Sequence, residues 1–542
     1  MSDPKPSTPA RRIVDRIDAA FANAGASNGG GDALDVAGAE IDPTDSAEKP
    51  ARKGKKKDQQ RKAPRVRQSD GLVALLDEVS LWHSPTNEGF ATFTVGDHRE
   101  SWPLRSQNFR RKLALRSYKA TGAVPGAQAI DDAVRVLEAK AIEEGPEIAP
   151  WLRVGQREGC VFVDLCDSTW QVVEVNASGF RIRENGDDLP FIRTAGMMAL
   201  PEPVEGESID RLRRFVNVAS EDDFCLTVSW LVAAMRPTGP YPILCLNGEQ
   251  GSGKSTFSRL LRCLTDPNVA PIRAAPKDDR DLVVAASNSH MLVLDNVSKI
   301  DANLADSLCR LATGSGFSTR ALHTDRDEVL FMASRPAILN GIPSLTDRAD
   351  LADRSMTIRL RSIPETERLP EDEFWADFER TSPEIFGALL TAVSGAIRKI
   401  DGVRLTRYPR LADFARWATA AESGLGWDDG TFMRAYGENR KSVTDSAFEA
   451  DVVAVAIADL VQDEPLWSGT PTALLAALNQ GASEQMQRAH AWPKTPAGLG
   501  NRLERIAPLL RTKGIAVERR HSGTRSVTIT AAPRPGAESG VG

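Results

Sequence analysis

A glycine-rich stretch between residues 246 and 261, LNGEQGSGKSTFSRLL, constrains the fold of this chain more than any other feature. The apolar run at 241–246 before it has the length and composition of a buried parallel strand. From Gly248 to Ser255 the residues satisfy the spacing G-x-x-x-x-G-K-S, and apolar residues recur behind them at helical intervals. A strand, a glycine turn and a helix in this order predict an α/β domain with a parallel sheet.

The residue types in this stretch suit phosphate binding. Glycines let backbone N–H groups turn toward phosphate oxygens, and the start of a helix presents its positive end to an anion. Lys254 reaches the β and γ phosphates as a point charge, and the hydroxyl of Ser255 is a magnesium ligand. We therefore predict that ATP and Mg²⁺ bind here, through Gly248, Glu249, Gln250, Gly251, Ser252, Gly253, Lys254, Ser255 and Thr256. The alternative is a glycine-rich turn that arose by chance, which the strand before it and the helix after it disfavour.

A second apolar run, at 291–294, ends at Asp295. An acidic residue at the end of a buried strand holds magnesium and its waters in phosphate-loop enzymes, so we predict that Asp295 and Ser255 share the metal. The alternative is that Asp295 caps the next helix. Asn296 follows, and an amide cannot accept a proton at neutral pH. The general base is therefore left open: Asp295 covers both tasks, an acidic residue from elsewhere serves, or hydrolysis is slow.

Two further short apolar runs end or begin at polar residues. The run at 337–339 ends at Asn340, and the run at 356–360 follows Arg354 closely. Before them lies a segment, 313–325, with a glycine turn, a polar–apolar alternation and the basic residues Arg320 and His323. Taken alone, Asn340 is explained by a turn and Arg354 by a surface ion pair.

Over about residues 241–360, this order of parts resembles the superfamily 3 helicases of the AAA+ class, and more narrowly the primase-helicases of viruses, phages and plasmids. The resemblance implies a P-loop AAA+ fold in which Asn340 senses the γ phosphate or orients the attacking water. It implies that Arg354 neutralises charge on ATP bound to the neighbouring subunit, and that a hairpin with Arg320 and His323 grips DNA. The implied assembly is a homo-oligomeric ring with single-stranded DNA in its channel.

The C-terminal part resembles a second family. Helices are predicted at 445–460 and 470–478, the second with Thr470 as its N-cap, and an amphipathic basic helix is predicted at 496–513. Two short strands at 515–517 and 527–529 flank the turn HSGTR. Helices followed by such a hairpin resemble a winged-helix domain, in which one helix enters the major groove and the hairpin lies on phosphates. The residues expected to contact DNA there are Arg511, Arg519 and Arg525. Winged helices also serve as protein-docking modules, and that alternative stays open.

The composition limits the remaining possibilities. A net charge of −6 argues against a general polyanion binder, although a basic run lies between residues 52 and 67. The six cysteines form no C-x-x-C pair and have no histidine at zinc-finger spacing. The sequence has no secretory leader and no apolar run of membrane-spanning length. We therefore expect a cytoplasmic protein that does not enter membranes.

The domain organisation that we predict has six parts. They are a disordered tail with the basic run (1–70), a mixed α+β domain of unknown role (71–205), the P-loop AAA+ core with leading helices (206–365), a helical region (366–465), the winged-helix-like domain (466–532) and a second disordered tail (533–542).

The function that these features favour is an ATP-dependent DNA helicase or translocase in the replication of a mobile element or phage. Lys254, Asp295, Asn340 and Arg354 are its predicted catalytic residues, and ATP hydrolysis is its predicted reaction. The alternatives are a non-motor ATP-binding switch that binds DNA or a partner and assembles, and a P-loop small-molecule kinase.

Overall fold

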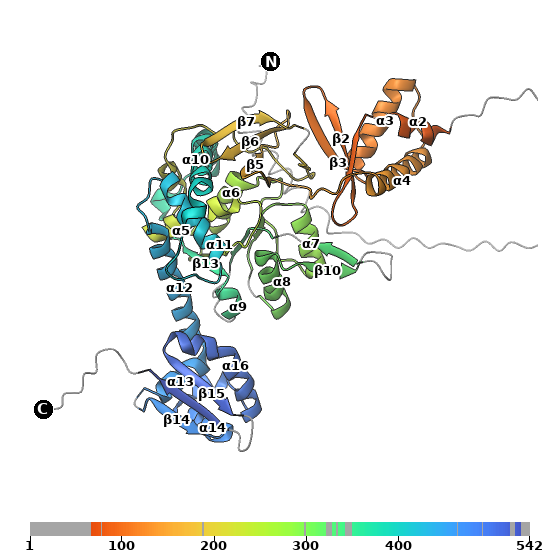
Figure 1. The fold of residues 1–542 in the computed structure, drawn as a ribbon. Coiled ribbons are helices and arrows are strands. Elements are labelled where there is room, and N and C mark those ends of the chain that lie inside the picture. The colour runs from red at the N-terminus through yellow and green to blue at the C-terminus, as the bar shows by residue number, and fades with distance from the viewer. Residues whose placement is uncertain are drawn as a thin grey trace, which may run out of the picture. The chain divides into compact units, whose positions relative to one another are not determined.

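Figure 1 shows the fold of the chain in a computed structural model. Its internal contacts divide it into two units, Met1–Pro150 and Trp151–Gly542, and each unit is described by itself. The structure describes residues 67–76, 78–186, 189–297, 300–320, 328–331, 334–341, 349–462, 464–489, 491–520 and 526–532. The boundaries of the six predicted parts are finer than this division and stay predictions. Both predicted tails lie outside the described residues, except that α2 already begins at Gln68.

Unit 1 is a three-stranded antiparallel sheet with helices on it. The strands pair in the order β1-β2-β3, and the elements are α2 (Gln68–Ala74), β1 (Ser80–His83), β2 (Gly89–Val95), β3 (His98–Pro103), α3 (Gln107–Thr121) and α4 (Ala127–Glu143). Phe93, Phe109 and Leu137 are buried together between sheet and helices. Ser106 caps α3 because its side chain accepts a hydrogen bond from the N–H of Phe109.

Unit 2 begins with a four-stranded antiparallel sheet in the order β4-β5-β6-β7. Its strands are β4 (Val154–Arg157), β5 (Cys160–Asp164), β6 (Gln171–Asn176) and β7 (Gly179–Glu184). The long helix α10 (Glu371–Lys399) packs against β6 and β7, as Figure 1 shows. This sheet and the central sheet that follows share one apolar core, to which Val163, Leu246 and Phe386 belong.

The central sheet of unit 2 has four parallel strands in the order β13-β8-β12-β9. They are β8 (Ile243–Asn247), β9 (Leu292–Leu294), β12 (Ala337–Asn340) and β13 (Ser355–Arg359), and their ends lie within about two residues of the predicted strands. The helices of this region are η1 (Ile209–Phe215), α5 (Glu221–Ala234), α6 (Lys254–Thr265), α7 (Asp279–Ser287), α8 (Ala302–Thr313) and α9 (Ala349–Ala352). The predicted mixed α/β class with a parallel sheet is therefore confirmed. The carboxyl ends of β8, β12 and β9 lie side by side at one edge.

An antiparallel pair of short strands, β10 (Phe317–Arg320) and β11 (Glu328–Phe331), lies between α8 and β12 in the chain. The predicted glycine turn is not the turn of this hairpin, because Gly314 has a φ of 74° and ends α8. A glycine at that position accepts the left-handed conformation that closes many helices. Arg320 is the last residue of β10, and His323 lies outside the described residues.

The region after the central sheet is helical, as predicted. It contains η2 (Glu365–Glu367), α10, η3 (Ile400–Gly402), α11 (Ala412–Ala421), η4 (Glu422–Gly424), α12 (Thr431–Ala450) and α13 (Val452–Leu460). A single helix was expected from 445 to 460, and that expectation was wrong. Asp451 breaks it, because its side chain accepts hydrogen bonds from the N–H groups of Val453 and Ala454 and so caps α13.

The last part of unit 2 has an apolar core of its own, which includes Leu474, Leu503 and Ile529. Its elements are β14 (Leu466–Gly469), α14 (Pro471–Gly481), α15 (Glu484–Arg488), α16 (Pro496–Thr512), β15 (Ile515–Arg520) and β16 (Ser526–Ala531). The three strands form an antiparallel sheet in the order β14-β16-β15. Thr470 caps α14 as predicted, and Arg525 lies outside the described residues.

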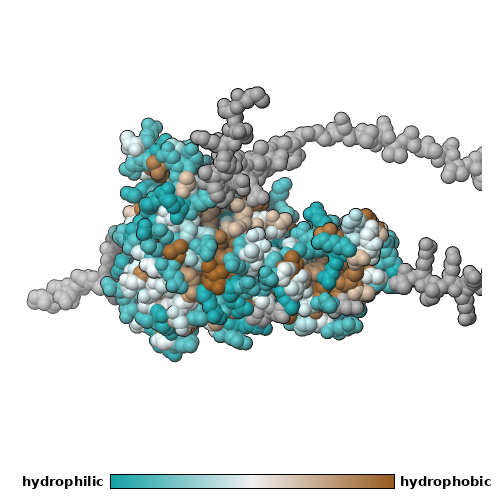
Figure 2. All heavy atoms as spheres, turned by 90° about the horizontal axis from the view of Figure 1, so that it is seen from above, coloured by the Kyte–Doolittle hydropathy of each residue, from teal (hydrophilic) through white to brown (hydrophobic). Residues whose placement is uncertain are grey.

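On the face drawn in Figure 2, apolar residues occur in small groups among hydrophilic ones. Scattered apolar residues of this kind are normal on protein surfaces. Among the described residues, no helix is long and apolar enough to cross a membrane.

Candidate functional site

The loop between β8 and α6, which we call the glycine loop (residues 248–253), has a backbone that only glycine adopts easily. Gly251 and Gly253 have φ angles of 83° and 70°, in the left-handed region where a side chain is strained. A Cβ added at Gly248 would lie 2.5 Å from the Oγ of Ser252 and 3.1 Å from the carbonyl oxygen of Leu360. The three glycines are therefore required by the shape of this turn.

Lys254 is the first residue of α6, directly after the glycine loop. Its Nζ donates hydrogen bonds to the carbonyl oxygens of Gly248 (2.7 Å) and Glu249 (2.8 Å). The ammonium group is thus held against the loop whose N–H groups and helix end favour an anion.

Ser255 and Asp295 meet across the carboxyl edge of the sheet. The Oγ of Ser255 lies 3.2 Å from both carboxylate oxygens of Asp295, which follows the last residue of β9. A hydroxyl and a carboxylate are oxygen ligands of the kind that Mg²⁺ prefers, so this pair fits the predicted metal. The alternative role of Asp295 as the cap of α8 belongs instead to Asp301, which accepts from the N–H of Leu304.

Asn340 fastens the turn after Asp295 to helix α6. Its Oδ1 accepts a hydrogen bond of 2.9 Å from the N–H of Asn296, and its Nδ2 donates to the Oγ of Ser258 at 3.3 Å. Asn340 is only 2 % exposed, and Asn296 has a φ of 53°, which asparagine tolerates better than most residues. The N–H of Asn296 also donates to Asp295 Oδ1 at 3.0 Å, so Asn340 and Asp295 position one another through it.

Arg354 lies at the other edge of the sheet. Its carbonyl oxygen accepts a hydrogen bond of 2.9 Å from the N–H of Ile243, the first residue of β8, and Ser355 pairs with Ile243 in register. Because β8 and β13 are parallel, Arg354 is at their amino ends and the glycine loop is at their carboxyl ends. The structure therefore brings together Lys254, Ser255, Asp295 and Asn340, but it does not bring Arg354 to this site in the same chain.

Residues far away in the sequence also support the glycine loop. The Nδ2 of Asn217 donates hydrogen bonds to the carbonyl oxygens of Ser252 (2.8 Å) and Arg361 (2.7 Å). The Oγ of Ser362 donates to Glu249 at 2.9 Å. A Cβ added at Gly251 would lie 3.6 Å from a terminal nitrogen of Arg368. Sequence reasoning missed these residues, because no local spacing signals a contact across 35 or 113 positions.

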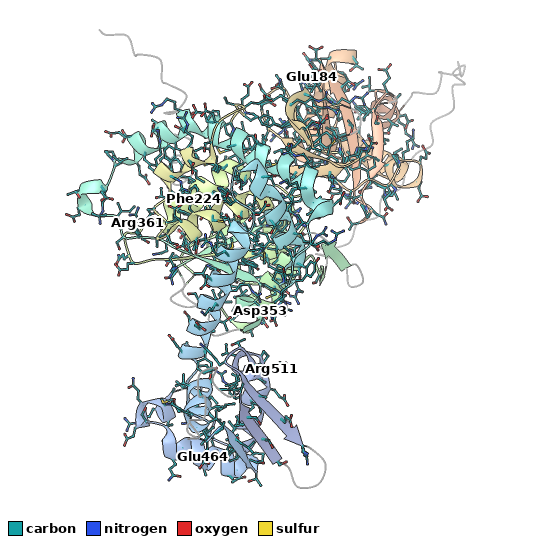
Figure 3. All side chains as sticks on the ribbon, turned by 60° about the vertical axis from the view of Figure 1, so that its left-hand side comes forward. Glu184, Phe224, Asp353, Arg361, Glu464 and Arg511 are labelled. Carbon is teal, nitrogen blue, oxygen red and sulfur yellow. The ribbon has the colours of Figure 1, made fainter. Side chains whose placement is uncertain are left out.

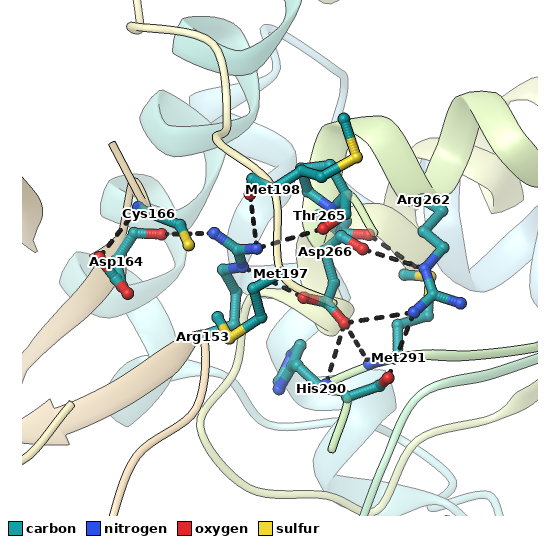
Figure 4. A network of polar contacts seen from close by, with 12 residues as sticks. Arg153, Asp164, Cys166, Met197, Met198, Arg262, Thr265, Asp266, His290 and Met291 are labelled. Atoms are coloured by element: carbon teal, nitrogen blue, oxygen red, sulfur yellow. Dashed lines mark hydrogen bonds and ion pairs between the residues drawn. The ribbon is translucent and has the colours of Figure 1, made fainter. Parts of the chain in front are cut away.

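A buried polar network holds the other end of α6 (Figure 4). Asp266 follows the helix, and its carboxylate accepts from Arg153 Nε (3.2 Å) and from the N–H groups of His290 (2.9 Å) and Met291 (3.1 Å). Burial by itself raises the pKa of Asp266, but the positive charges of Arg153 and Arg262 outweigh it and hold that pKa below its usual value. Burial lowers the pKa of His290 to about 4. The network joins the antiparallel sheet, α6 and β9.

The predicted DNA-binding arginines of the C-terminal part differ in their surroundings. Arg519 forms an ion pair with Glu504 and donates to the carbonyl oxygen of Gly500 at 3.0 Å. Arg511, labelled in Figure 3, lies near the end of α16 and is exposed. Arg505 on the same helix and Arg520 at the end of β15 are exposed as well. Arg519 therefore holds β15 against α16, and the exposed basic residues are its neighbours.

Two family models match adjoining parts of the chain. Residues 209–445 match the model of the actinomycete integrative conjugative element replication protein, and residues 453–539 match that of the AICE RepA C-terminal domain. The first match spans the central sheet with the glycine loop, and the second spans α13 to β16. No curated protein matches the chain.

Several solved structures are similar to the chain at low identity. An A-form apo structure of the NrS-1 C-terminal region is 11 % identical, covers 85 % of this chain and 98 % of that chain, and gives a TM-score of 0.38. A second A-form apo structure (12 %, 0.36) and a further apo structure (11 %, 0.37) of that region cover the same shares. TM-scores this low do not establish a shared fold.

Proposed function

Because this chain is a replication protein of a mobile element, similar to those of actinomycete integrative conjugative elements, we propose that unit 2 contains an ATP-driven motor. The proposed activity is that of a DNA helicase or translocase of the superfamily 3 type, with a P-loop AAA+ core. It hydrolyses ATP to ADP and phosphate while it moves on DNA.

The observation that carries this proposal is the contact of Ser255 with both carboxylate oxygens of Asp295 at 3.2 Å. These residues follow β8 and β9, and Asn340 ends the strand between them. Parallel α/β sheets bind their ligands at the carboxyl ends of their strands, and all three residues lie at that edge. Three motifs that are separate in the sequence thus converge where a nucleoside triphosphate would bind.

In this proposal the N–H groups of the glycine loop and the ammonium of Lys254 bind the β and γ phosphates. Ser255 and Asp295 would hold Mg²⁺, which when bound neutralises charge on the phosphate oxygens. Asn340 orients the attacking water or senses the γ phosphate, through the turn that it fastens. Arg354 acts on ATP of the neighbouring subunit, which requires a homo-oligomer, and a ring is the arrangement that closes such a contact.

DNA is the partner expected of a replication protein. We propose that the β10–β11 hairpin, with Arg320 and His323, contacts single-stranded DNA inside the ring. We propose that the C-terminal part, in which one strand, three helices and two further strands follow one another, is a winged-helix-like domain, and that Arg511 and Arg525 contact DNA there.

A second candidate function is a non-motor ATP switch, and Asn296 is the observation that favours it. Many AAA+ proteins have a glutamate at this position as the general base, and an amide cannot take a proton at neutral pH. The exposed Asn296 instead holds the turn through its backbone N–H. In the motor proposal Asp295 or another acidic residue must therefore accept the proton.

The two candidates are separated by measuring ATP binding and ATP turnover in the same variants. Lys254→Ala should abolish binding or turnover, and Asp295→Asn should lose turnover while keeping binding. Lys277→Ala is the matched control, because Lys277 is an exposed lysine before α7. Undiminished ATP hydrolysis by the Lys254 variant would contradict both candidates. Nucleotide-dependent assembly without strand displacement would favour the switch.

A further inference from the structure

A cavity of about 440 Å³ lies between the segment before α5 and the residue Arg361 that follows β13. Its lining includes Arg213, Val216, Val218 and Phe224. Phe224 and Arg361 are labelled in Figure 3, which shows that they come from different elements of unit 2. None of these residues belongs to the set that the glycine-loop pattern singles out.

The cavity is attached directly to the glycine loop. The two donor hydrogens of the Asn217 amide hold the carbonyl oxygen of Ser252, in the loop, and that of Arg361, in the cavity wall. The segment 217–219 also pairs with the end of β13. Val218 forms a β-bridge with Leu360, and the N–H of Ala219 donates a hydrogen bond of 2.8 Å to the carbonyl oxygen of Arg359. The cavity therefore has a fixed position beside any ligand on the loop.

The cavity offers a flat face for stacking. The guanidinium of Arg213 lies 3.9 Å over the ring of Phe224, and Asp210 (2.7 Å) and Glu221 (2.8 Å) hold it by ion pairs. Phe224 is only 2 % exposed, whereas the side chain of Arg213 is 41 % exposed, so Arg213 is the accessible member of this stacked pair. Bases stack well on arginine planes.

The lining of the cavity combines paired charge, polar groups and apolar surface. Asp210 and Glu221 pair with Arg213 and offset its positive charge, and Arg361 is the second arginine of the lining. Val216, Val218 and Ala219 contribute apolar surface to the rest of the lining, and Ser220, Glu221 and Arg361 contribute polar surface. A planar heterocycle with polar groups at its edge fits a lining of this mixed character.

We propose that this cavity binds the base of the nucleoside triphosphate whose phosphates lie on the glycine loop, with Arg213 as the stacking residue. The proposal rests on the proposed nucleotide-binding function, which it extends from the phosphates to the base. It assigns a binding role to residues before α5 that carry no recognisable sequence motif.

The test compares a ligand that has a base with one that lacks it. ATP and inorganic tripolyphosphate, each with Mg²⁺, are titrated calorimetrically into the full chain. Wild type should bind ATP more tightly than tripolyphosphate. Arg213→Ala should weaken ATP binding about tenfold, because one stacking contact is lost, and should leave tripolyphosphate binding unchanged.

Arg214→Ala is the matched control, since Arg214 lies over Phe215 (4.7 Å) and pairs with Asp377 outside the cavity lining. Ala219→Leu gives an independent test, because Ala219 is exposed at the cavity and a leucine there would fill it. It should reproduce the selective loss of ATP binding.

Three results would overturn the base-binding proposal. In the first, wild type binds ATP and tripolyphosphate with equal affinity. In the second, Arg213→Ala and Ala219→Leu weaken the binding of ATP and of tripolyphosphate equally. In the third, neither variant weakens ATP binding. Failure of the proposed function looks different, since wild type would then bind neither ATP nor tripolyphosphate.

Discussion

The buried ion pair between Arg153 and Asp266 gives a sharp prediction, since both side chains are 0 % exposed. Arg153 also donates to the carbonyl oxygens of Asp164 and Met198, each at 2.9 Å. Arg153→Met keeps most of the apolar stem. It removes one of the positive charges beside the buried carboxylate of Asp266 and the donor to the carbonyl oxygens of Asp164, Met198 and Pro267. Removing one partner of a buried pair costs about 3–5 kcal/mol, so we expect the free energy of unfolding to fall by that amount.

The assay is urea unfolding at pH 7, followed by tryptophan fluorescence, with hydrogen exchange in α6 as a local readout. Arg181→Met is the matched control, because Arg181 is 69 % exposed in its pair with Glu174 and surface pairs contribute about 0–1 kcal/mol. Combining Arg153→Met with Asp266→Asn should recover part of the loss, since the unpaired charge is gone. A loss from Arg153→Met no larger than that of the control would refute this reasoning.

Three other predictions concern the same region and the C-terminal part. Burial lowers the pKa of His290 from 6.5 to about 4, so the unfolded chain takes up this proton first as the pH falls. Stability should therefore decrease by about 3 kcal/mol between pH 6.5 and 4, at roughly 1.4 kcal/mol per pH unit, and His290→Gln should remove that slope in urea titrations. Asn340→Ala should reduce ATP turnover while ATP binding persists, because the turn after Asp295 loses its attachment to α6; equal loss of both would contradict a positioning role. Replacing the exposed Arg505, Arg511 and Arg520 by alanine should weaken DNA binding and flatten its dependence on salt by about 1 per lost phosphate contact. Unchanged DNA binding would indicate a docking module.

The sequence predicts the glycine loop and the strand ends well, because both depend on short-range patterns. Gly251 and Gly253 have the backbone that their spacing implies, and Asp295 and Asn340 follow apolar runs of strand length. The parallel sheet then brings these residues to one edge without any further information. The predicted role of Arg354 is different, since a contact with a neighbouring subunit has no counterpart in a single chain.

The supporting contacts could not be predicted from the sequence, because they join segments that are distant along the chain. Asn217 meets Ser252 across 35 positions and Arg361 across 144. Ion pairs could not be predicted either. The sequence does not distinguish an exposed arginine on an amphipathic helix from one that, like Arg502, forms an ion pair with a distant residue, here Asp451. The break at that same aspartate shows how one capping side chain overrides a continuous helical pattern.

We propose that the glycine loop belongs to a motor that DNA activates. The most direct test is the rate of ATP hydrolysis by the purified full chain, with and without single-stranded DNA, with Lys254→Ala as the background. The motor proposal predicts that single-stranded DNA raises the rate of ATP hydrolysis well above that of the protein alone. It also predicts that the Lys254 variant does not hydrolyse ATP, with or without DNA. A rate that single-stranded DNA does not change, or one that survives in the Lys254 variant, would contradict it.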